Sequence, residues 1–139
     1  MTSVDELLAD DIEYRDDVIS RGLNECVELL PKQESSYDRM FYMGSIKGFE
    51  ECRSYAKLSD FERRFCELHR LEHREISKGS LSDTELRRML GLKDSERVTN
   101  DNKVWFYKGV RTQVEYVRDH LLAHMALKEI YFPLSPAWL

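Results

Sequence analysis

Apolar residues recur every three or four positions along most of the chain, which is the spacing of one face of an α-helix. The stretches that show this spacing predict helices over residues 4–30, 37–57, 59–79, 83–90 and 102–131. The apolar stripe of the last stretch consists of Tyr107, Val110, Val114, Val117, Leu121 and His124. The pattern predicts an all-α fold, a helical bundle of four to five helices with long first and last helices.

Residues that start and stop helices stand at the ends of these stretches. Pro31 cannot continue the first helix, and Gly79 and Gly91 suit the left-handed position that follows a helix. Three serine–glutamate pairs have the spacing of a capping box, in which both side chains bond backbone N–H groups of the first turn. The pairs are Ser3 with Glu6, Ser59 with Glu62 and Ser82 with Glu85. The polar stretch 93–102 is the predicted loop before the last helix.

Three residues interrupt the apolar stripes in an informative way. Gly44 and Gly48 lie in the stripe of the second predicted helix, where each costs about 1 kcal/mol relative to alanine. We therefore expect another backbone to pack closely over these two glycines. Arg15 interrupts the stripe of the first predicted helix.

The chain ends in a short apolar segment that its prolines keep from being helical. Residues 132–139 read Phe-Pro-Leu-Ser-Pro-Ala-Trp-Leu. This extended C-terminal tail either packs back onto its own bundle or docks on a neighbour. The triplet 105–107 adds an aromatic cluster, of which at least one ring must lie outside the core stripe, because consecutive helical residues point about 100° apart. Exposed aromatic residues mark partner surfaces. The predicted partner-binding residues are Trp105, Phe106, Phe132, Leu134, Trp138 and Leu139.

The composition is that of one globular domain covering residues 1–139. Apolar residues make up 42% and charged residues 34% of the chain, a mixture far from that of disordered proteins. No apolar run approaches the roughly 18 residues of a membrane span, and the N-terminus lacks the features of a signal peptide. The three cysteines, Cys26, Cys52 and Cys66, lack CxxC spacing, which favours buried, reduced thiols. We expect a cytoplasmic protein without membrane contact.

Charge is distributed unevenly along the chain. The net charge is −5, but residues 1–30 hold nine acidic residues and two arginines, which gives −7. The remainder, with seventeen acidic residues and nineteen Lys or Arg, carries +2. The acidic first helix is interpreted as a solvated face, and the alternative is a surface for a basic partner or a mimic of nucleic acid.

The four histidines form two HxxxH pairs, whose spacing places two imidazoles on one face of a helix. The pairs are His69 with His73 and His120 with His124. Together with Glu72, the first pair matches the H-x-x-E-H string of inverted zinc peptidases. Those enzymes are large and use a further acidic ligand well downstream, whereas only 66 residues follow the string. We interpret it as coincidental and expect no enzyme, no cofactor and no metal. A four-histidine metal site between two helices is the alternative.

Residues 83–103 have some features of a helix-turn-helix, with a short helix, a glycine turn and polar residues beyond it. Arg87 stands where that motif requires a small buried residue, and Asp94, Glu96 and Asp101 balance the basic charge. A helix–loop–helix corner is the favoured interpretation. A nucleic-acid-binding or regulatory module is the alternative function.

The segment Tyr37–Glu51 resembles a pattern of small tailed-bacteriophage proteins, in which a helix reads aromatic-x-x-Gly-x-Ile-x-Gly-aliphatic-x-Glu. Phe49 replaces the aliphatic residue, and the likeness covers about fifteen of 139 residues. The resemblance implies a small all-α phage protein, built into the virion near the head–tail junction or serving packaging. The leading hypothesis is a non-enzymatic structural or assembly protein, a homo- or hetero-oligomer located in the host cytoplasm or the virion.

Overall fold

The structure, a computed structural model, describes residues 5–79, 81–93 and 97–131. In these ranges the chain is all-α, as the hydrophobic pattern predicts. The helices are α1 (Ala9–Leu29), α2 (Ser36–Cys52), α3 (Leu58–His73), α4 (Asp83–Leu90) and α5 (Asn100–Tyr131). Two 3₁₀ turns, Leu30–Lys32 and Ile76–Lys78, follow α1 and α3. None of the described helices is long and apolar enough to cross a membrane.

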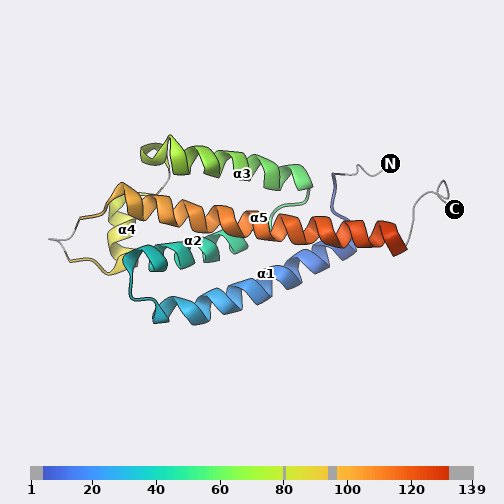
Figure 1. The fold of residues 1–139 in the computed structure, drawn as a ribbon, viewed down its shortest axis with the longest axis horizontal. Coiled ribbons are helices and arrows are strands. Elements are labelled where there is room, and N and C mark those ends of the chain that lie inside the picture. The colour runs from blue at the N-terminus through green and yellow to red at the C-terminus, as the bar shows by residue number, and fades with distance from the viewer. Residues whose placement is uncertain (1–4, 80, 94–96, 132–139) are drawn as a thin grey trace.

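The long helix α5 runs through the middle of the bundle, and α1, α2 and α3 pack along it (Figure 1). α2 is parallel to α5, whereas α1 and α3 are antiparallel to it (Figure 1). The short α4 lies at the end of the bundle where α5 begins. The stripe predicted for the last helix forms the centre of the core, because Val110, Val114, Val117 and Leu121 are fully buried.

Glycines permit the close packing of α2 on α5, as the sequence predicts. A Cβ atom at Gly44 would collide with the carbonyl oxygen of Phe106, and one at Gly48 would lie 2.7 Å from that of Val110. A third glycine, Gly109 of α5, faces the backbone of α2 in the same way. The two parallel helices therefore meet backbone to backbone.

The first helix begins at Ala9, so the prediction that it begins near residue 4 is wrong. The preceding segment is extended and pairs with the α2–α3 connection instead. The Leu7 N–H donates to the Ala56 carbonyl at 2.9 Å, and the Leu58 N–H donates to the Asp5 carbonyl at 2.8 Å. These tertiary bonds compete with a further helical turn. Ser3, the start of the first predicted capping box, lies outside the described residues.

The capping box predicted at Ser59 is also wrong. α2 already ends at Cys52 rather than at 57, and α3 begins one residue before Ser59. The Asp60 carboxylate accepts the N–H group of Lys57 at 3.1 Å, which is the capping bond of this helix. Ser59 donates its hydroxyl to the Asp5 carboxylate at 2.6 Å. Asp60, at the third helical position, therefore takes the role that the prediction gave to Glu62, and Ser59 does not cap the helix.

Of the two glycines predicted to end a helix in the left-handed conformation, only Gly91 does so. Gly91 has φ of 65° directly after α4, the left-handed conformation expected there, and the Ser82 box that starts α4 is formed. α3 ends at His73, and Gly79 has φ of −67°, so the left-handed cap predicted there is wrong. At Gly79 the Tyr107 hydroxyl occupies the space that a Cβ would need. This glycine provides room for a ring rather than a helix stop.

Two of the three cysteines are buried, as expected, but Cys66 is exposed. Burial raises the pKa of both the Cys26 and the Cys52 thiols. The buried thiols are therefore protonated at neutral pH and poor nucleophiles. Arg15, which interrupts the stripe of α1, is buried as well, and it donates to the Tyr55 carbonyl at 2.6 Å.

Candidate functional site

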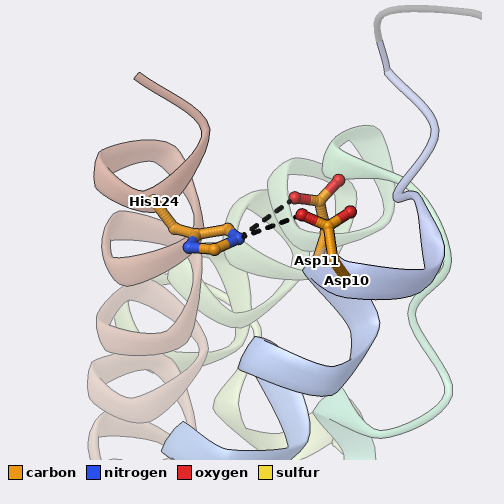
Figure 2. A group of neighbouring side chains, drawn as sticks. All are labelled: Asp10, Asp11 and His124. Atoms are coloured by element: carbon orange, nitrogen blue, oxygen red, sulfur yellow. Dashed lines mark ion pairs between the residues drawn. The ribbon is translucent and has the colours of Figure 1, made fainter. Parts of the chain in front are cut away.

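An ionic cluster joins the first turn of α1 to the last turns of α5. Asp10, Asp11 and His124 place one ligand atom each within 4.8 Å of one another. The His124 imidazole points from α5 toward both carboxylates (Figure 2). Its Nε2 atom lies 3.5 Å from Asp11 Oδ1 and 3.7 Å from Asp10 Oδ2. In the described part of the chain, no other group of three His, Cys, Asp or Glu side chains has this spacing.

Asp11 is the buried member of the cluster, with a side chain that is 1% exposed. A buried carboxylate requires hydrogen bonds or a counter-charge to offset its lost hydration. Its Oδ2 atom accepts the Leu8 N–H at 2.9 Å, which caps α1, and its Oδ1 atom accepts a hydrogen bond from Lys128 at 2.6 Å. One carboxylate thus both starts α1 and fastens it to α5.

Lys128 bridges the two aspartates. Its ammonium lies 2.9 Å from Asp10 Oδ2 in addition to its bond with Asp11. The hydrogen bond from Lys128 lowers the pKa of Asp10. Burial by itself would lower the pKa of Lys128, but its hydrogen bonds to Asp11 and Asp10 outweigh that effect and raise it. The cluster therefore contains a cation beside two carboxylates.

His124 is held in place without a hydrogen bond to its Nε2 atom. Its ring stacks on Tyr14 of α1, with centroids 4.2 Å apart and planes 8° from parallel. The Nε2 atom is buried and has no hydrogen-bond partner. Buried polar atoms in proteins are nearly always bonded. Imidazole nitrogen and carboxylate oxygen are donor atoms of the kinds that divalent cation sites use.

The four predicted histidines do not form one site. His69 and His73 are exposed on α3, with ring centroids 4.5 Å apart. His120 bonds the Tyr116 carbonyl at 2.9 Å through Nδ1. His73 Nε2 lies 3.9 Å from Glu72 Oε1, whereas His124 is the one histidine that lies beside two carboxylates in the described part of the chain. α1 brings the carboxylates of Asp10 and Asp11 beside His124, a member of the second pair.

Glu72, the glutamate of the zinc-peptidase string, is bound to an arginine. Its side chain is 4% exposed, and its two oxygens accept from Arg111 at 2.6 and 3.3 Å. A general base must be able to reach a water or substrate proton. The ion pair with α5 gives this glutamate a structural role.

The last turns of α5 carry an exposed apolar surface, which we call the α5 apolar face. Leu122 and Leu127 are 45% and 52% exposed, and Ala123 and Ala126 are also exposed. The four residues are two pairs spaced by four positions, so they form one continuous strip. The tail residues predicted to bind a partner, Phe132, Leu134, Trp138 and Leu139, follow this face in sequence and lie outside the described residues.

The aromatic triplet is less available to a partner than predicted. Phe106 is a buried core residue, 8% exposed, and its backbone lies against Gly44 of α2. Its prediction as a partner-binding residue is therefore corrected. Trp105 is half-buried against Phe41 of α2, and the Lys108 ammonium lies 4.5 Å from its ring centroid.

The acidic charge of α1 is largely paired within the molecule. Pairing of this kind weakens the attraction of a carboxylate for an external basic partner. The pairs are Asp10 and Asp11 with Lys128, Asp16 with Arg15, Asp17 with Arg21 and Glu28 with Lys32. These contacts favour the interpretation of α1 as a solvated face.

The segment 83–103 contains a short helix, a left-handed turn and the start of α5. Arg87 donates to the Lys93 carbonyl at 3.3 Å beyond the end of α4. Lys103 pairs with Asp83 at 3.0 Å. Both basic groups therefore have partners within the corner, and residues 94–96 lie outside the described ranges.

No protein-family model, curated protein or solved structure matches this chain. Its function must therefore be inferred from its own residues. The α1–α5 cluster was missed by the sequence analysis because 113 positions separate Asp11 from His124. The signal that could have indicated a buried carboxylate was the position of Asp11, four residues after Leu7 and seven before Val18, on the face that α1 buries.

Proposed function

We propose that this protein is a non-enzymatic assembly protein that acts through protein–protein contacts, and that it associates with itself through the end of α5. The observation that carries the proposal is the α5 apolar face. It lies on the two turns that precede an apolar tail sequence.

The two exposed leucines lose contact with water when a partner covers them, which is favourable. Burying a leucine side chain contributes about 1.5–3 kcal/mol, so two of them can supply only part of the free energy of association. The tail sequence holds four further large apolar residues, Phe132, Leu134, Trp138 and Leu139. Ala123 and Ala126 leave room for a second helix to approach closely.

The support of α5 by the bundle favours such a role. Leu121 is fully buried, although it directly precedes the α5 apolar face, and Lys128 ties the same turns to α1. A surface fixed in this way loses little conformational freedom when a partner binds. The resemblance to small tailed-phage proteins supports a virion component or packaging protein in the host cytoplasm.

The experiment measures molar mass by light scattering over a range of concentrations. Wild-type protein is expected to form an oligomer, and Leu122→Ser with Leu127→Ser is expected to weaken association at least tenfold. Val27→Ser is the matched control, because Val27 is 58% exposed on α1, away from this face. A wild-type monomer at every concentration, or a double variant that assembles normally, would contradict self-assembly through α5.

A further inference from the structure

The three candidate ligand atoms of the α1–α5 cluster have spacings that suit a small divalent cation. Zinc binds imidazole nitrogen and carboxylate oxygen at about 2.0–2.1 Å in tetrahedral geometry. Two ligands of such a tetrahedron lie about 3.3 Å apart, which follows from those bond lengths. The distances from His124 Nε2 to the two aspartate oxygens are 3.5 and 3.7 Å. Small side-chain movements would bring all three atoms onto one ion.

The surroundings of the cluster hold two of these ligands in a ligating orientation. Asp11 uses Oδ2 to accept the Leu8 N–H, which leaves Oδ1 for a cation. Bonds of this kind orient the carboxylates of metal sites. The stacked Tyr14 ring fixes the His124 imidazole, whose buried Nε2 atom has no hydrogen bond. Asp10 is 55% exposed, so water can complete the coordination.

We propose that Asp10, Asp11 and His124 form a zinc site, in which the metal ion competes with the ammonium group of Lys128. The ammonium bonds the same two oxygens that would ligate the metal. Lys128 is 30% exposed and can turn into solvent when the metal binds. Zinc would then replace a lysine link between α1 and α5 with a metal link that includes His124.

Substituting the competing Lys128 distinguishes a metal site from a cluster that contains only ion pairs. Zinc is titrated by calorimetry into full-length wild type, Lys128→Met, and Lys128→Met combined with His124→Asn. The lysine variant is expected to bind one zinc ion at least tenfold more tightly than wild type, and the combined variant is expected to lose this binding. If Lys128→Met binds no more tightly, or the combined variant binds equally well, the proposal is overturned.

The exposed pair on α3 provides the control for adventitious binding. Two imidazoles spaced by four positions on a helix can hold zinc by themselves. The variant His69→Asn with His73→Asn keeps the α1–α5 cluster intact and is expected to retain the zinc-induced rise in Tm. Loss of that rise would assign the metal to the α3 pair and overturn the proposal.

A second measurement leaves Lys128 in place, so that it tests the site even if the lysine variant does not fold. Excess zinc is expected to raise the Tm of wild type but not that of His124→Asn. Magnesium is expected to have no effect, because it prefers octahedral sites of oxygen ligands. An equal Tm rise in His124→Asn, or no rise in wild type, would refute the site.

Discussion

Asp10 and Asp11 are neighbours in sequence but have very different surroundings. Asp11 is buried, caps α1 and bonds Lys128, whereas Asp10 is 55% exposed. We predict that Asp11→Ala lowers the free energy of unfolding by about 2 kcal/mol, since it removes a helix cap and a partner of a charged group. Asp10→Ala is expected to cost clearly less. Urea unfolding of both variants tests this, and equal losses would contradict it.

The stability that the cluster contributes should depend on pH in a defined direction. The pKa of Asp10 is lowered in the folded protein, so its contribution is present above the ordinary aspartate pKa and is lost as pH falls through the lowered value. The pKa of Lys128 is raised, so its contribution is present below the ordinary lysine pKa and is lost as pH rises through the raised value.

The Tm difference between wild type and Lys128→Met is therefore expected to be largest between about pH 5 and pH 10. It should shrink in more acidic solution, where Asp10 becomes protonated. Melting curves followed by circular dichroism across this range provide the measurement. A difference that grows on acidification would show that Lys128 acts through something other than its carboxylate partners.

The sequence could not predict these pairings, because they join residues more than a hundred positions apart. Lys128 looks like a surface residue of its own helix, and the position of Asp11 in its helix does not indicate which partner it finds. Arg15 looks like an interruption of a stripe, yet it bonds a carbonyl forty positions away. Hydrophobic spacing identifies the face that is buried, but it does not identify which polar groups find partners within that face.

At the scale of elements, the glycines of α2 and α5 determine how closely the two helices pack. We predict that Gly109→Ala lowers the free energy of unfolding by about 2 kcal/mol or more, because the added methyl group meets the Phe41 carbonyl. That loss exceeds the gain of about 1 kcal/mol from better helix propensity. Gly22→Ala should cost less, since its methyl group meets only the tip of the Phe49 ring. Chemical unfolding measures both, and a stabilised Gly109→Ala would contradict the packing.

The ion pairs between α3 and α5 permit a second prediction at this scale. Glu72 is buried against Arg111, so Glu72→Leu alone is expected to destabilise the protein by about 2–3 kcal/mol. The arginine would lose its buried partner and keep only the longer contact with Glu115, at 3.9 Å. Adding Arg111→Met should recover most of the loss. Urea unfolding of the single and double variants gives the coupling, and purely additive losses would show that the pair is not coupled.

Helix boundaries were predicted correctly where local chemistry decides them. Ser82 and Gly91 enclose a short helix whose caps use only residues of that segment. The predictions at Ser59 and at residue 4 failed because the N-terminal segment pairs with the α2–α3 connection. A capping signal thus predicts a boundary when no distant segment competes for the same N–H and hydroxyl groups.

At the scale of the whole molecule, α1, α2 and α3 pack around α5, the last of the described helices in sequence. The all-α class and the buried stripe of α5 could be predicted, since the 3.6-residue period specifies them directly. The parallel arrangement of α2 and α5 could not be predicted, because the hydrophobic period shows which face of a helix is buried but not which helix packs against it. The same limit applies to the candidate site, of which the sequence indicated His124 but not its two acidic neighbours.

The central position of α5 also has a consequence for how the chain folds during synthesis. The helices α2 and α3 pack mainly against α5, and α1 packs against both α2 and α5. α5 is translated after all three. Contacts between distant segments form late, because a long loop must close first. The emerging chain should therefore remain without a core until α5 has left the ribosome. A fragment of residues 1–98 is expected to show little cooperative melting, and a stable, cooperatively melting fragment would show that the first four helices fold on their own.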